Sequence, residues 1–159
     1  MIAIKIKNDE ISRALAALSA HMADMTVPMT RVGQYLIVST KERFAEGVSP
    51  EGAKWAPKSP TTLAAYGARK TNRMDVRPLF GPSLSLSTQF SYDAKPDSLE
   101  FGSPMIYAAM QQFGGTKAQF PNLWGNIPAR PFLGISDKDE TNIVGILAEW
   151  AEKAAAGGA

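Results

Sequence analysis

Hydrophobic positions recur at helical spacing near both ends of the chain. A first stripe of apolar residues three and four apart predicts a helix up to about Met25, and a second stripe predicts a helix from about Pro28 to Ala45. Pro28 suits a first helical turn, and Gly47 is placed to end the second helix. We therefore expect two consecutive N-terminal helices that form a hairpin or a kinked pair.

The C-terminal region holds the clearest helical pattern. Ser136 can cap a helix whose first turn carries acidic side chains, which favour the positive end of a helix. The apolar stripe of this helix consists of Ile143, Ile146, Leu147, Trp150, Ala151 and Ala154. We expect a long amphipathic helix that packs this stripe against the rest of the domain.

The remaining patterns predict a small amount of β-structure and short helices. Isoleucines at positions 2, 4 and 6 predict a short N-terminal strand. Residues 84–92 and 98–102 predict an antiparallel pair around the turn 94–97, although 83–88 also fits a helix. Ser103-Pro104 predicts the start of a short helix that Gly114-Gly115 ends.

The segment 47–82 is rich in proline, with five of the chain's eleven between residues 48 and 83. We expect a long mobile loop here, most exposed at 67–77, with one short helix that begins at Pro60. Between residues 54 and 77 lie six cations opposed only by Asp75: Lys54, Lys58, Arg69, Lys70, Arg73 and Arg77. Interleaved with Trp55 and Tyr66, they fit either a phosphate backbone or acidic patches on a neighbouring protein. The small net charge favours the second interpretation.

A rigid segment, 127–134, precedes the C-terminal helix. Pro128 and Pro131 fix the backbone on either side of Arg130, and the apolar residues Phe132 and Leu133 follow. Rigid arms with aromatic and arginine anchors are typical of interface cores. A proline-rich turn that leads into a core strand explains the same residues equally well.

Composition excludes several classes of function. The 159 residues suggest one domain, 1–159, with a net charge of +2, no cysteine and a single histidine, His21. No segment is apolar over the length of a bilayer, and the N-terminus lacks the apolar core of a signal peptide. No metal-ligand cluster, nucleotide-binding motif or catalytic motif is present, so we expect no cofactor and no metal.

Three blocks, in this order, carry a resemblance to a known family. They are Phe44 to Leu63 with its Trp55-Ala-Pro element, Pro78-Leu79-Phe80 through Gln112-Phe113-Gly114-Gly115, and Ile127-Pro128-Ala129-Arg130-Pro131-Phe132-Leu133-Gly134. The chain resembles the phage virion morphogenesis family, the tail completion and head–tail joining proteins of Mu-like tailed phages. It departs from the family pattern at Gln111, where the family usually has histidine, and at Gly81-Pro82-Ser83.

The resemblance implies an α+β fold in which N- and C-terminal helices pack on a small antiparallel sheet, as in neck and tail-terminator proteins. It implies a structural virion protein without enzymatic activity, assembled in the host cytoplasm into a ring, commonly six-fold, at the head–tail neck or tail terminus. The partners implied are other copies, neighbouring neck and tail tube or sheath proteins, and DNA in the channel, with no membrane.

We expect the interface to use aromatic and polar residues of all three blocks. The candidates are Trp55, Arg69, Lys70, Arg73, Arg77, Tyr107, Gln112, Phe113, Arg130 and Phe132. Two competing hypotheses are a DNA-binding module that uses residues 54–77 and a small hydrolase with carboxylate chemistry.

Overall fold

The computed structural model describes residues 9–68, 75–123 and 125–156, with the side chains of 9–11 left out. It is a small α+β fold, in which the described residues form helices and one antiparallel pair of strands. The elements are α1 (Asp9–Met22), α2 (Thr26–Glu46), α3 (Pro60–Ala68), α4 (Ser85–Thr88), β1 (Ser91–Ala94), β2 (Leu99–Gly102), α5 (Ala108–Phe113) and α6 (Asp137–Ala155).

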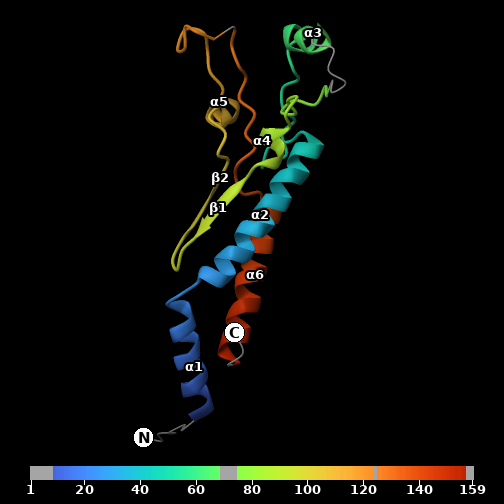
Figure 1. Cartoon of the computed structure of the whole chain (residues 1–159). Helices are drawn as coiled ribbons and strands as arrows, with labels where there is room; N and C mark the ends of the chain where they lie inside the picture. Colours follow the sequence, from blue (N-terminus) through green and yellow to red (C-terminus); the bar gives the residue numbers. More distant parts are fainter. Residues whose placement is uncertain (1–8, 69–74, 124, 157–159) are drawn as a thin grey trace, which may run out of the picture.

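The molecule is elongated along α2 (Figure 1). Helix α6 packs along α2, and the hairpin of β1 and β2 packs on α2 as well. Helix α1 contacts α6 at one end of the molecule, while α3 and α5 lie at the other end (Figure 1). The N- and C-terminal helices therefore form a stalk, and the proline-rich segments gather at its far end.

The hairpin is held closely against α2. Its register pairs Ser91 with Gly102 and Ala94 with Leu99. The ring of Tyr92 lies over Gly33 of α2, where an added Cβ would come within 2.5 Å of the ring carbons. A two-stranded sheet is marginal by itself, so this close packing on α2 is what supports it.

An aromatic core joins segments that are distant in the sequence. Its buried members are Phe44, Trp55, Leu79, Leu86, Ala108 and Phe132. The ring of Phe44, 1% exposed, makes edge contacts with Trp55 at 5.2 Å and with Phe132 at 5.4 Å between centroids. Since aromatic pairs favour this geometry, Phe44 at the end of α2 organises the three blocks around itself.

The long helices confirm the hydrophobic pattern, with small changes at their ends. Gly47 ends α2 in the left-handed conformation, at φ 71°. Ser136 begins α6 with a capping box to Asp139. The break between α1 and α2 comes earlier than expected because Met25 donates its backbone N–H to Pro96 of the hairpin turn, at 3.0 Å.

Of the two interpretations left open for residues 83–88, the structure confirms the helical one. Residues 85–88 form α4, preceded by Leu84 at φ 58°, and β1 begins only at Ser91. The alternation at Leu84 and Leu86 was too short to distinguish a strand from a helical turn. Helix α5 begins at Ala108 rather than at Ser103. The expected strand at residues 2–6 lies outside the described residues.

Much of the segment 47–82 is anchored to the core. Val48 pairs with Lys54 in an isolated bridge, Trp55 is buried, and α3 begins at Pro60 as expected. Residues 69–74 of this segment lie outside the described ranges, so the mobility of 67–77 stays a prediction.

Candidate assembly surface

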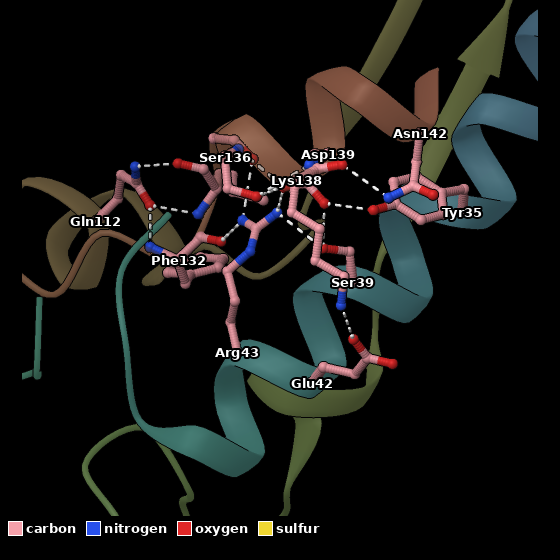
Figure 2. Close-up of polar contacts among 12 residues, drawn as sticks. Tyr35, Ser39, Glu42, Arg43, Gln112, Phe132, Ser136, Lys138, Asp139 and Asn142 are labelled. Carbon is pink, nitrogen blue, oxygen red and sulfur yellow. Dashed lines mark hydrogen bonds and ion pairs between the residues drawn. The ribbon is translucent and has the colours of Figure 1, made fainter. Parts of the chain in front are cut away.

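A buried ion pair fixes α6 and the rigid arm, residues 127–134, on α2. Asp139 is 0% exposed and accepts hydrogen bonds from Arg43 Nη2 at 2.5 Å and Ser39 Oγ at 2.5 Å (Figure 2). It also accepts from Tyr35 Oη at 2.9 Å and from the Ser136 backbone N–H at 2.8 Å. We call these five residues the Asp139 cluster.

The electrostatics of this cluster favour an ionised Asp139. Burial raises the pKa of Asp139, but hydrogen bonds from Ser39, Ser136 and Tyr35 outweigh burial and bring the pKa to about 2. Arg43 also donates to the backbone oxygens of Phe132 at 3.1 Å and Gly134 at 2.9 Å. The cluster thus holds the end of the arm as well as the two helices.

Gln112 holds the same arm from α5. Its Oε1 accepts from the backbone N–H of Phe132 at 2.9 Å and of Leu133 at 3.0 Å, and its Nε2 donates to the Leu133 oxygen at 2.9 Å. These bonds imitate the pairing of a neighbouring strand, so Gln112 positions the arm.

Arg130 binds the chain's own loop. Its Nε donates to Ala56 O at 2.7 Å and its Nη2 to Pro57 O at 2.9 Å, while Nη1 reaches Gln111 Oε1 at 3.4 Å. Trp55 completes the contact between loop and arm, since its Nε1 donates to Pro131 O at 2.8 Å. The arm therefore leads into the core, which agrees with the alternative interpretation of residues 127–134 as a proline-rich turn before a core segment.

Three of the expected surface anchors are therefore corrected. Trp55 and Arg130 are each 7% exposed, and Phe132 is 0% exposed. Their side chains are enclosed by the aromatic core and by loop carbonyls of the same chain, and of the three only Arg130 also lines a hollow at the surface.

Four exposed apolar residues of the described ranges lie in or near α5, while the others are spread over the molecule. Ile106 is 99% exposed, Phe113 78%, Phe120 48% and Tyr107 42%. We call these four residues the α5 surface. Tyr107 and Phe113 were expected at the interface, whereas Ile106 and Phe120 were missed, although both lie in apolar positions next to turn residues.

Two hollows flank the α5 surface. One, of about 520 Å³, lies against Tyr107, and the other, of about 770 Å³, lies against Phe113 and Phe120. Asn126, Ile127 and Pro128 line both hollows and form the wall between them. The arm thus presents its first residues to the surface and its last residues to the core.

The described cations of residues 54–77 are engaged within the chain. Arg77 pairs with Asp75 and lies over the ring of Phe80, 3.6 Å from its centroid. Lys54 donates to Glu46 O at 2.8 Å, and Lys58 donates to Asp75 O and Phe80 O. The other expected contacts, Arg69, Lys70 and Arg73, lie outside the described residues.

Within the described ranges, no group of three or more His, Cys, Asp or Glu side chains could hold a metal ion. No described helix is long and apolar enough to cross a membrane. The described part of the chain thus offers packing surfaces and hydrogen-bond donors.

Comparison with known proteins gives a consistent picture. Residues 6–152 match the phage virion morphogenesis family. A putative capsid assembly protein G of Escherichia phage Mu is 31% identical over 134 residues, which cover 84% of this chain and 83% of that protein. No solved structure matches the chain.

Proposed function

The chain belongs to the phage virion morphogenesis family, which points to a structural or assembly role. We propose that it forms a ring that joins or completes the tail. The ring would stand at the head–tail neck or at the tail terminus of the virion. Its partners would be further copies, commonly six in all, and the adjoining neck and tail tube or sheath proteins.

The α5 surface is the observation that carries this proposal. Soluble monomers rarely expose apolar side chains in a contiguous patch, and such patches mark interaction sites. Ile106, Tyr107 and Phe113 lie within a few residues of one another beside a hollow on either side. Aromatic residues of this kind supply most of the binding energy of protein interfaces.

A second copy is the occupant that we assign to the α5 surface. A ring requires a heterologous contact, in which one face of each subunit meets a different face of the next. The surface lies at one end of an elongated molecule, while the stalk of α1, α2 and α6 extends to the other end (Figure 1). This shape leaves different faces of the subunit free for its two neighbours.

DNA binding through residues 54–77 is less well supported. Non-specific binding to DNA needs several cations that face the phosphates together. The described cations of this segment, Lys54, Lys58 and Arg77, are each bonded to groups of the chain itself. Any contact between the proposed ring and DNA in the channel would therefore be non-specific.

Native mass spectrometry of the purified chain tests the ring. We expect Ile106→Asp to shift the wild-type multimer to monomer, because burying an unpaired carboxylate in an interface is unfavourable. Val144→Asp is the matched control, since Val144 is 59% exposed on α6, away from the α5 surface.

Both variants should keep the wild-type melting temperature, as exposed substitutions usually change stability by no more than about 0.5 kcal/mol. The ring proposal would be contradicted if the wild-type chain stayed monomeric both alone and when mixed with phage tails assembled without this protein. A multimer that survives Ile106→Asp would remove the α5 surface from the ring contact.

A further inference from the structure

A groove at the α5 end of the molecule is lined by two buried cations. The groove, the hollow of about 520 Å³, has Lys58, Tyr66, Tyr107 and Arg130 among its lining residues. Lys58 is 9% exposed and Arg130 is 7% exposed. We call it the Lys58 groove.

Neutral oxygens are the only acceptors that the described chain gives to these cations. Lys58 Nζ donates to the backbone oxygens of Asp75 and Phe80 and lies 5.0 Å from the centroid of the Tyr66 ring. Arg130 donates from its side chain to two backbone oxygens and to the Gln111 amide. An ammonium has three N–H donors and a guanidinium five, so both side chains keep N–H groups for a further acceptor.

Among the described residues, only Asp75 offers a nearby negative charge to Lys58, and none forms an ion pair with either cation. No described Asp or Glu forms an ion pair with Lys58 or Arg130, and the carboxylate of Asp75 is bound by Arg77 at 2.5 Å. The sequence outside the described ranges contains no Asp or Glu. Asp9 and Glu10, whose side chains are not described, belong to α1 at the opposite end of the molecule (Figure 1).

This arrangement is unfavourable for the chain alone. Burying a charge costs free energy unless an opposite charge or strong hydrogen bonds compensate for it. Burial lowers the pKa of Lys58, the charge of Asp75 opposes this effect, and the nearby charges of Arg130 and Arg77 lower the pKa further. A carboxylate that enters the groove could accept hydrogen bonds from both cations, and such charge-assisted bonds are stronger than neutral ones.

We propose that the Lys58 groove binds a carboxylate-bearing segment of a different, acidic protein of the particle. The ring of Tyr66, which lines the groove, would pack against the peptide beside its acidic residue. A second copy is less suitable, because the chain has a net charge of +2 and several of its exposed carboxylates pair with its own lysines. A groove with two buried cations also fits one anionic side chain better than a run of phosphates, which needs a row of exposed cations.

Photo-cross-linking in assembled particles tests this assignment. The full chain carries p-benzoylphenylalanine in place of Tyr66, a half-buried residue that lines the groove and lies outside the α5 surface, or in place of Val38, an exposed control residue on α2. We expect Tyr66→p-benzoylphenylalanine to link to a peptide of another particle protein with an Asp or Glu within a few residues. A link to a second copy, to a peptide without a nearby carboxylate, or to nothing would overturn the proposal.

A charge placed in the groove gives a matched pair of variants. Ser83 is an exposed residue of the groove wall, so Ser83→Glu adds a carboxylate there and Ser83→Gln adds the same length without charge. We expect Ser83→Glu to lower the cross-link yield about tenfold through like-charge repulsion and Ser83→Gln to leave it within about twofold.

Equal yields from these two variants, at equal melting temperatures, would overturn the proposal. So would binding of a 20-base-pair DNA duplex that Ser83→Glu abolishes and Ser83→Gln preserves. These two outcomes do not depend on ring formation, which native mass spectrometry of the purified chain tests separately.

Discussion

Asp139→Asn should destabilise the domain more than any exposed charge substitution. Asp139 is 0% exposed and accepts from Arg43, Ser39 and Tyr35. Replacing the carboxylate by a neutral amide leaves the guanidinium of Arg43 buried without its counter-charge. Removal of one partner of a buried ion pair costs about 3–5 kcal/mol, which is a large part of the 5–15 kcal/mol that typically stabilises a domain.

The pH dependence of the unfolding free energy provides a second, independent test of this prediction. The pKa of Asp139 falls from 3.8 to about 2 on folding, and each pKa unit corresponds to about 1.4 kcal/mol, so the ionised carboxylate contributes about 2 kcal/mol. Because the folded-state pKa is the lower one, this contribution is fully present above pH 3.8 and is lost as the pH falls from 3.8 to 2. The difference in stability between wild type and Asp139→Asn should therefore narrow by about 2 kcal/mol over that interval.

Urea unfolding followed by tryptophan fluorescence, at a series of pH values from 7 to 2, measures both quantities. Asp137→Asn is the control, since Asp137 is an exposed residue in the same first turn of α6. It should cost no more than about 1 kcal/mol through the helix dipole. A loss below 1 kcal/mol for Asp139→Asn at pH 7, or a difference from wild type that stays constant down to pH 2, would refute the reasoning.

Three further substitutions test the packing of the fold. Trp150→Ala should cost about 3–5 kcal/mol because its ring is 5% exposed and lies against His21 of α1. An unchanged melting temperature would show that the stripe of α6 does not face the core. Gly33→Ala should destabilise the domain by about 1–3 kcal/mol because the added Cβ would overlap the Tyr92 ring. Hydrogen exchange should show the loss of protection in the hairpin, and a uniform loss over the domain would contradict this explanation. Arg130→Ala should cost about 1–3 kcal/mol of stability, because the carbonyls of Ala56 and Pro57 would lose their hydrogen-bond donor. Normal stability combined with failed joining of heads to tails would show that Arg130 acts at an interface instead.

The regular elements could be predicted because their signals are local. The stripe of α6, its Ser136 cap and the Gly47 end of α2 depend on residues within a few positions of one another. Short elements carry too little information, which is why the pattern at residues 83–88 fits both a strand and the helix α4 that forms there. The α+β class followed from the resemblance to the family, and the structure confirms it.

The buried charges could not be predicted from the sequence, because their partners are distant in it. Arg43 and Asp139 are 96 positions apart, and Arg130 binds a backbone oxygen 74 positions away. A charged residue is normally assigned to the surface, and nothing near Lys58 or Arg130 in sequence indicates the carbonyls that hold them. For the same reason Phe132 resembled an interface anchor, although its ring fills the core beside Phe44.

The most direct test of the proposed ring is electron cryo-microscopy of the intact particle with this chain located in the density. The account predicts several copies in a closed ring at the neck or tail terminus. In that ring, Ile106 and Phe113 of each copy should be buried against the next copy. A single copy, or a ring in which these two side chains face solvent, would contradict it.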